Sequence, residues 1–217
     1  MTEATAAPDA SPCVLIIDDD AEFRESVVRL LRSVGLATRQ FSSASDFFKS
    51  GELPDRPTCL VVDIRMPGQS GLEFQRELSA ANKDLPIIFI TGHGDIPMTV
   101  RAMKAGAIEF LTKPFRDQDL LDAIDAGLAR DRARRASARA LEALRRRFDS
   151  LTSREREIMV QATAGRLNKQ IAGDIGITES TVKVHRANLM KKMKARSLPE
   201  LSRMADILGL APGTRPS

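Results

Sequence analysis

The sequence predicts an α/β domain with a five-stranded, parallel, doubly wound sheet, followed by an all-α, four-helix domain with a helix-turn-helix, joined by a helical linker. Short apolar runs alternate with stretches of helical periodicity in the first half of the chain, and several helical segments separated by short turns fill the second half. Residues 1–128 carry 13 basic and 20 acidic residues, whereas residues 129–217 carry 20 and 9. Net charges of −7 and +11 indicate two separate tasks and a nucleic-acid partner for the second half.

Five β-rich runs define the expected sheet, and the polar residues 1–12 before them are expected to be disordered. Apolar residues spaced three or four apart lie between the runs and predict helices that cover the sheet. Continuous apolar runs of about four residues are typical of parallel strands that are covered on both faces. The expected strands are Cys13 to Ile17, Ala37 to Phe41, Thr58 to Val62, Ile87 to Ile90 and Glu109 to Leu111.

Several classes of protein are excluded by the composition. No apolar run approaches the roughly 18 residues that a membrane helix needs, so we expect a cytoplasmic protein with no membrane partner. Cys13 and Cys59 each begin an apolar run, and we expect buried thiols there rather than a disulfide or a metal site. The sequence contains neither of the glycine-rich motifs that bind nucleotide phosphates.

Polar side chains follow four of the expected strands. Asp18 and Asp19 come after the first strand, Asp63 after the third, Thr91 after the fourth and Lys113 after the fifth. Because the carboxyl ends of parallel strands meet at one edge of the sheet, these groups should converge. Carboxylate oxygens suit Mg²⁺, while an ammonium and a hydroxyl suit phosphoryl oxygens. An acidic residue at a strand end is often only a helix cap, so it is the combination that predicts a cation and phosphoryl site.

Four stretches of residues 13–128 resemble the receiver domains of bacterial two-component response regulators, and the last two resemble the FixJ branch of that family in particular. The resemblance implies a flavodoxin-like fold that catalyses only its own phosphoryl transfer and autodephosphorylation and is otherwise not an enzyme. The stretches are Val14-Leu-Ile-Ile-Asp-Asp-Asp, Val61-Val-Asp-Ile-Arg-Met-Pro-Gly, Ile90-Thr-Gly-His-Gly-Asp-Ile-Pro-Met and Ala102-Met-Lys-Ala-Gly-Ala-Ile-Glu-Phe-Leu-Thr-Lys-Pro-Phe.

The resemblance also implies roles for individual residues of this chain. Asp63 is implied as the phosphoacceptor, with Lys113 and Thr91 in contact with the phosphoryl group. Asp18, Asp19, Asp63 and the backbone carbonyl of Arg65 are the implied ligands of Mg²⁺ or Mn²⁺.

A conformational switch is implied as well. Phe110 stands at the aromatic switch position and is expected to turn inward as Thr91 closes on the phosphoryl group, although a plain core residue is the alternative. His93 is expected to be a loop residue rather than a base. The Lys113–Pro114 bond is cis in the family.

Residues 129–147 form the expected linker. Eight Arg stand between Arg130 and Arg147 against one Asp and one Glu, and neither Pro nor Gly interrupts that stretch. We therefore expect the last helix of the first domain to continue into the linker with a solvated basic face. Contact with DNA and docking on the acidic first domain are the alternatives.

The second domain, residues 148–210, is expected to contain four helices, followed by a tail at 211–217. Thr152-x-x-Glu155 is a capping box that opens the first helix. A short helix over residues 168–175, a turn at Gly176 and a longer helix from Glu179 to about Lys194 have the size of a helix-turn-helix. Ser197 starts a fourth helix that ends near residue 209.

The longer helix has two different faces on a helical wheel. A narrow apolar stripe is expected to be buried, and the opposite face, with small residues at its centre and lysines around it, suits the major groove of DNA. The stripe contains Val182, Leu189 and Met193. Arg186 lies beside the stripe, and we expect an ion pair with Glu155 or a neighbour rather than a contact with a base.

This second domain resembles the LuxR/NarL-type helix-turn-helix through Leu151-Thr-Ser-Arg-Glu-Arg-Glu-Ile, Asn168-Lys-Gln-Ile-Ala and Thr181-Val-Lys-Val-His-Arg-Ala-Asn-Leu-Met-Lys-Lys-Met. In the family the fourth helix pairs two domains on a dyad, which implies a palindromic promoter site. Some relatives have Lys where this chain has Ala187, so the DNA sequence cannot be borrowed from them. The implied base-facing residues are Lys183, Val184 and Ala187, and the implied phosphate contacts are Asn168, Lys169, Thr181 and Lys191.

Together these features predict a transcription factor that is switched by phosphorylation. A sensor histidine kinase would phosphorylate Asp63, and phosphorylation would promote a homodimer through the fourth and fifth helices and fifth strand of the receiver, with promoter DNA and RNA polymerase as further partners. A regulator that binds DNA without phosphorylation is one alternative. An aspartyl-phosphate phosphatase is another, but such enzymes need a second Asp two residues after the nucleophile, where this chain has Arg65.

Overall fold

The computed structural model describes residues 11–51, 53–92 and 94–210. The predictions for residues 1–10, for His93 and for the tail at 211–217 lie outside these ranges. The chain divides into two compact units, residues 1–135 and 136–217, and each is described by itself.

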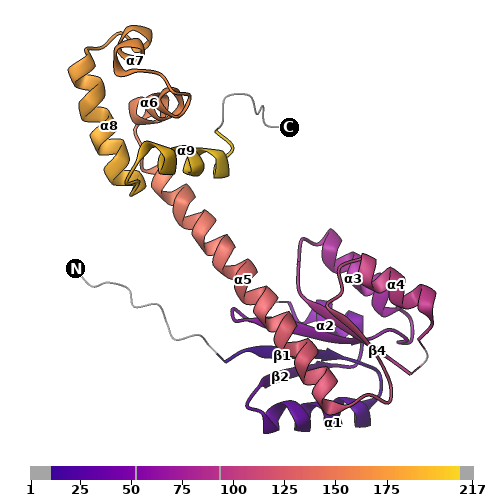
Figure 1. The fold of residues 1–217 in the computed structure, drawn as a ribbon. Coiled ribbons are helices and arrows are strands. Elements are labelled where there is room, and N and C mark those ends of the chain that lie inside the picture. The colour runs from indigo at the N-terminus through magenta and orange to yellow at the C-terminus, as the bar shows by residue number, and fades with distance from the viewer. Residues whose placement is uncertain (1–10, 52, 93, 211–217) are drawn as a thin grey trace. The chain divides into compact units, whose positions relative to one another are not determined.

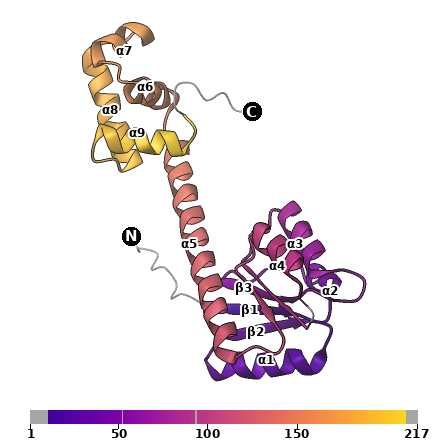
Figure 2. The same ribbon diagram turned by 45° about the vertical axis from the view of Figure 1, so that its right-hand side comes forward.

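The first unit contains a five-stranded sheet in the order β2-β1-β3-β4-β5, in which all neighbours are parallel (Figures 1 and 2). Figure 2 shows β3, β1 and β2 side by side. The predicted strands are confirmed, with β3, β4 and β5 each extended by one residue. The strands are β1 (Cys13–Ile17), β2 (Ala37–Phe41), β3 (Thr58–Asp63), β4 (Ile87–Thr91) and β5 (Glu109–Thr112).

Two layers of helices cover the sheet, as the apolar runs predict. Along β1, Leu15 and Ile17 belong to a core beneath α2, α3 and α4, whereas Val14 and Ile16 belong to a core beneath α1 and α5. Side chains that alternate between two buried faces explain why the strands are apolar throughout. The helices are α1 (Ala21–Ser33), α2 (Ala44–Lys49), α3 (Gly71–Ala80), α4 (Ile96–Lys104) and α5 (Asp117–Asp149).

The polar residues that begin these helices act as caps. Asp20 accepts hydrogen bonds from the backbone N–H groups of Glu22 and Phe23, and Ser70 forms a capping box with Glu73. The caps fix where α1 and α3 begin after β1 and β3. The Lys113–Pro114 bond is cis, as the resemblance implies.

Helix α5 is one continuous helix of 33 residues, and a buried carboxylate fastens it to β3. Asp131 is fully buried and accepts hydrogen bonds from the backbone N–H of Thr58 at 2.9 Å, from Nη2 of Arg134 at 2.6 Å and from Nε of Arg135 at 2.7 Å. Arg135 also binds Asp55 at 3.0 Å. Arg134 and Arg135 therefore bind carboxylates of the first unit, and at Arg135 the alternative of docking on the acidic first domain applies instead of the expected solvated face.

The second unit contains four further helices around one core, as predicted. The capping box of Thr152 and Glu155 is present, and α7 ends at Gly176 before Thr178 caps α8. Buried residues from all four helices and Leu144 of α5 form the core. The helices are α6 (Ser153–Thr163), α7 (Asn168–Ile175), α8 (Glu179–Met193) and α9 (Leu198–Ile207).

Both cysteines are buried and free, which confirms the prediction for them. Burial raises the pKa of Cys59 to about 12, so its thiol stays protonated and unreactive. Within the described ranges no helix combines the length and the apolar character that crossing a membrane requires.

We predict that Asp131→Ala lowers the free energy of unfolding by about 2 kcal/mol at pH 7, because the buried N–H of Thr58 loses its acceptor, Arg134 loses its carboxylate partner and Arg135 keeps only Asp55. Burial acts to raise the pKa of Asp131, but hydrogen bonds from Arg135 and Arg134 outweigh it and lower the pKa. The stabilisation should therefore be present at neutral pH and disappear as the pH falls below about 4. Urea unfolding followed by circular dichroism measures both effects.

Glu142→Ala is the matched control, because Glu142 forms an exposed ion pair with Arg146 at 3.3 Å in the same helix. This variant should change the free energy of unfolding by less than about 0.5 kcal/mol. Equal losses for the two variants would contradict a special role for Asp131.

Candidate functional site

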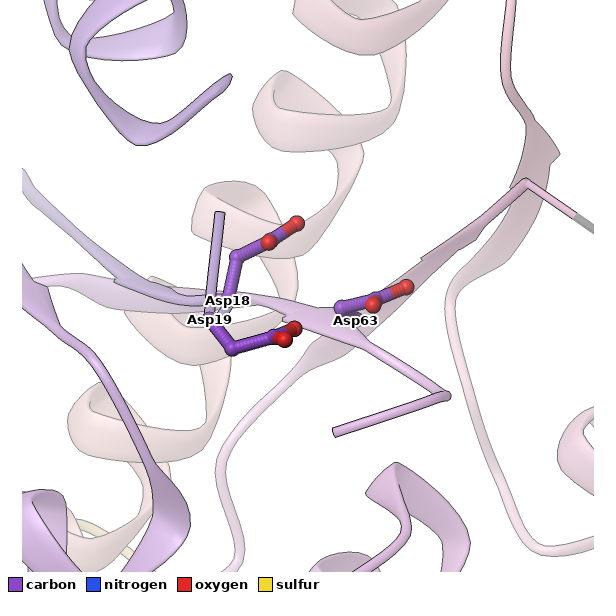
Figure 3. A group of neighbouring side chains, drawn as sticks. All are labelled: Asp18, Asp19 and Asp63. Atoms are coloured by element: carbon purple, nitrogen blue, oxygen red, sulfur yellow. The ribbon is translucent and has the colours of Figure 1, made fainter. Parts of the chain in front are cut away.

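Three carboxylates meet at the carboxyl end of the sheet. Asp18 and Asp19 follow β1 and Asp63 ends β3, and oxygen atoms from all three lie within 4.8 Å of one another (Figure 3). The arrangement follows from topology, because β1 and β3 are parallel neighbours with Ile17 opposite Val62. The convergence predicted from the sequence is confirmed for these three residues.

Asp18 is held by several hydrogen bonds. Its Oδ1 accepts from the backbone N–H of Asp20 at 2.8 Å, and its Oδ2 forms an ion pair with Nζ of Lys113 at 2.8 Å. Nη1 of Arg24 donates to the backbone carbonyl of Asp18 at 2.6 Å. Lys113 thus reaches the cluster from the end of β5, as predicted, and in this structure its direct partner there is Asp18.

Asp63 is the most perturbed carboxylate of the cluster. Its side chain is buried, and its Oδ1 has no hydrogen-bond partner among the described residues. Burial and the neighbouring Asp18 raise the pKa of Asp63 to about 6, although Lys113 and the backbone N–H groups of Arg65 and Ile64 act to lower it. The ionised form of Asp63 is therefore only partly stabilised by its neighbours, and additional positive charge would stabilise it.

The donor set fits a small divalent cation. All three side chains offer oxygen, which suits Mg²⁺ or Mn²⁺ better than the softer metals that Cys and His ligands select. Asp19 is exposed, so an ion can enter from solvent. A cavity of 660 Å³ opens beside Asp19 and Arg65.

Helix α3 approaches the cluster closely. A Cβ at Gly71 would lie 2.6 Å from the backbone oxygen of Asp63, so only glycine allows α3 to start against the end of β3. The glycine thereby holds the carboxyl end of β3 in place.

Thr91 and Phe110 lie on the neighbouring strands. Thr91 is buried at the end of β4 opposite Thr112, and Phe110 is half-buried on β5 opposite Phe89. A Cβ at Gly94 would lie 2.8 Å from Cε1 of Phe110, so the ring packs directly against the Gly94 backbone. The expected switch residues therefore stand two positions apart on paired strands next to the loop that follows β4.

Arg24 and Phe23 contribute to this site, and the sequence analysis missed them. Both lie in the first turn of α1, where Arg24 binds the backbone of Asp18 and the Phe23 ring contacts Lys113. The only signal in the sequence was their position directly after the acidic residues.

The exposed face of α8 agrees with the helical wheel. Val182, Leu189 and Met193 are fully buried, whereas Val184 is 60% exposed. The other residues expected near bases, Lys183 and Ala187, are exposed as well, and so are Lys169 and Lys191. Asn168 and Thr181 are half-buried.

Of the two partners expected for Arg186, Glu155 or a neighbour, Glu155 is wrong, and the neighbour is a neutral amide rather than a carboxylate. Lys192 pairs with Glu155 at 2.7 Å, and Arg186 instead donates from Nη1 to Oδ1 of Asn168 at 2.7 Å. Burial acts to raise the pKa of Glu155, but Lys192 and Thr152 outweigh it and lower the pKa. The contacts tie α8 to α6 and to the start of α7, and the side-chain nitrogen of Asn168 is still able to donate to a phosphate.

Comparison with known protein families assigns both parts of the chain. Residues 14–125 match the model described as the response regulator receiver domain. Residues 149–205 match the model described as bacterial regulatory proteins of the luxR family.

Similar proteins share this two-part organisation over nearly their whole length. Nodulation protein W of Bradyrhizobium diazoefficiens is 51% identical over 198 residues, which cover 91% of this chain and 87% of that protein. The transcriptional regulatory protein FixJ of Azorhizobium caulinodans is 47% identical over 205 residues, which cover 94% of this chain and 96% of that protein. The structure of the response regulator StyR, 50% identical, matches with a TM-score of 0.80 over 91% of this chain and 99% of that one. The chain therefore belongs to the response regulator family, as a transcription factor with a receiver domain and a LuxR-type DNA-binding domain.

Proposed function

We propose that a sensor histidine kinase phosphorylates Asp63 with the help of Mg²⁺ or Mn²⁺, and that phosphorylation promotes dimerisation and sequence-specific binding to promoter DNA. The observation that carries this proposal is the acidic cluster. Three carboxylates with oxygens within 4.8 Å of one another, one of them with its pKa raised to about 6, form a site that calls for a cation and a phosphoryl group.

The phosphoryl transfer follows from the positions of the side chains. A carboxylate oxygen of Asp63 attacks phosphorus while the P–N bond to the kinase histidine breaks and its electron pair stays on the imidazole nitrogen. Lys113 turns from Asp18 toward the phosphoryl oxygens, and Thr91 donates a hydrogen bond to them. Asp18, Asp19, Asp63 and the backbone carbonyl of Arg65 would hold the divalent cation, which supplies positive charge next to these oxygens.

The switch begins at Thr91. As Thr91 closes on the phosphoryl group, the loop against which Phe110 packs moves and the ring turns inward. The outer surface of α4 supports a dimer interface in this region, because Ile96, Val100 and Met103 are exposed apolar side chains. The homodimer therefore forms through α4, β5 and α5.

The exposed face of α8 enters the major groove in this proposal. Lys183, Val184 and Ala187 face the bases, and Lys191 and Lys169 lie near phosphates. Lys183 forms an exposed ion pair with Glu179 at 3.3 Å, which is weak enough to be released on DNA. Pairing through α9 would give a palindromic site, and a promoter-bound dimer could contact RNA polymerase.

We predict that Asp63→Ala abolishes labelling by radioactive acetyl phosphate and Mg²⁺ and leaves the circular dichroism spectrum of the full chain unchanged. The variant removes the attacking oxygen while the strand that carries it stays covered by both layers of helices. Label that persists in the variant would show that another residue is the phosphoacceptor. A regulator that ignores phosphorylation would bind promoter DNA equally well with and without acetyl phosphate.

We predict that Asp63→Asn stabilises the metal-free protein. An Asp in the unfolded chain titrates near pH 4, so a folded pKa of about 6 means that ionising Asp63 between about pH 4 and 6 disfavours the fold. The variant should raise the free energy of unfolding by roughly 1–3 kcal/mol at pH 7.5 in EDTA, and by less at pH 4.5. Urea unfolding measures the difference.

Two further conditions test the same carboxylate. Mg²⁺ should reduce the difference in free energy of unfolding between Asp63→Asn and the wild type, because a bound cation stabilises the wild-type carboxylate. The exposed Asp125→Asn on α5 serves as control and should show no comparable gain. If Asp63→Asn were less stable than the wild type at pH 7.5, ionised Asp63 would not destabilise the metal-free fold.

We predict different effects for two lysines of α8. Lys183→Ala should relax sequence preference, whereas Lys191→Ala should weaken binding to all sequences and reduce the slope of log affinity against log salt by about one. Fluorescence anisotropy with specific and random duplexes at several salt concentrations measures both. Lys49→Ala, at an exposed position of α2, is the control and should change neither quantity. An unchanged salt slope for Lys191→Ala would remove Lys191 from the phosphate contacts.

A further inference from the structure

The ammonium of Lys113 has two partners, one charged and one aromatic. Its Nζ lies 2.8 Å from Oδ2 of Asp18 and 3.6 Å from the centroid of the Phe23 ring. An ammonium so close to a ring face is attracted by the negative charge density of that face. The Lys113 side chain is 25% exposed, so this attraction is only partly weakened by water.

Packing holds the Phe23 ring in this orientation. Phe115 meets it edge to face, with the centroids 6.2 Å apart and an interplanar angle of 85°. Phe23 lies three residues after the Asp20 cap, in the first turn of α1, and the cap fixes the start of that helix. The ring is therefore a firm surface beside Lys113.

The proposed phosphorylation demands that Lys113 change partners. Asp18 binds Lys113 in this structure, yet the same carboxylate is needed for the divalent cation. The Phe23 ring offers no oxygen to a cation and repels phosphoryl oxygens, so it attracts the ammonium without competing for either of them.

We propose that Phe23 is a positioning residue that keeps the Lys113 ammonium beside the phosphorylation site while its anionic partner changes from Asp18 to the phosphoryl group. This inference rests on the phosphorylation of Asp63 proposed above. A cavity of 590 Å³ adjoins Phe23, Lys113 and Phe115. Without the ring face, water from this cavity would compete for the ammonium and leave it more freedom to turn away.

The rate of phosphorylation by acetyl phosphate and Mg²⁺ tests the role of the ring. Phe23→Leu keeps an apolar side chain but lacks the aromatic face, and it should lower the second-order rate constant about three- to tenfold. Phe23→Tyr keeps the face and should stay within about twofold of the wild type. Phe115→Leu removes the ring that packs edge to face on Phe23 but leaves the aromatic face at the ammonium, and it should cause a clearly smaller loss than Phe23→Leu.

A double-mutant cycle with Lys113→Ala separates positioning from general packing. In the Lys113→Ala background, Phe23→Leu should cause no further loss beyond about twofold. A similar loss in both backgrounds, equal losses for Phe23→Leu and Phe115→Leu, or a failure of Phe23→Tyr to retain the rate would each overturn the proposal. Wild-type rates for Phe23→Leu would overturn it too and leave the phosphorylation of Asp63 standing, whereas label on Asp63→Ala would overturn that phosphorylation itself.

A fluorescence measurement keeps the proposal testable if Phe23→Leu folds poorly. The chain contains neither Trp nor Tyr, so Phe23→Trp introduces a single fluorophore against Lys113. Its emission should change when Mg²⁺ and the phosphoryl analogue beryllofluoride are added, and this change should disappear in the Lys113→Ala background. An equal change in both backgrounds would show that the ring does not respond to the ammonium.

Discussion

Burial of a carboxylate, Asp63, beside a second carboxylate, Asp18, is the constraint on which the site of the receiver domain depends. Asp18, Asp19 and Asp63 have oxygens within 4.8 Å of one another, and Asp63 is buried with a pKa of about 6. The strand order makes this cluster unavoidable, because β1 and β3 are parallel neighbours whose carboxyl ends adjoin. The fold therefore holds together groups that repel each other, as functional sites commonly do. Positive charge relieves the repulsion, from Lys113 within the chain and from a bound divalent cation, which would also offset the negative charge of a phosphoryl group.

The cluster draws its counter-charge from one distant and one nearby part of the sequence. Lys113 comes from the end of β5, and Arg24 binds the backbone of Asp18 from the first turn of α1. Lys113 can serve both Asp18 and a phosphoryl group only because its long side chain turns easily, and that freedom has to be limited if the ammonium is to stay near Asp63. The face of the Phe23 ring at 3.6 Å limits it without adding another anion to a site that already has three.

The sequence predicted the parts of the structure that depend on periodicity and topology. Apolar runs located all five strands, and the convergence of Asp18, Asp19 and Asp63 followed because parallel strands end at a common edge. It did not predict which long side chains pair. Arg186 was expected to pair with Glu155 or a neighbour, but Lys192, six residues further along α8, pairs with Glu155, and Arg186 binds the amide of Asn168. Flexible side chains that stand one or two turns apart on a helix cannot be ranked as partners until the neighbouring helices are placed. Asp131 was more accessible to prediction, because it precedes Arg134 and Arg135 at helical spacing within a basic run.

A signal that starts at Asp63 has to leave the site through packing rather than through charge. Toward solvent the field of an added phosphoryl group is screened over about 8 Å at physiological salt, and the accompanying cation would cancel much of its charge locally. The strands next to Asp63 are tightly packed, so a displaced hydroxyl at Thr91 must displace what lies against it. The packing is tight beside Thr91. Phe110 packs on the backbone of Gly94, where a Cβ would lie 2.8 Å from the ring. In the proposed switch, a movement of the loop after β4 toward the ring would therefore displace Phe110 on β5.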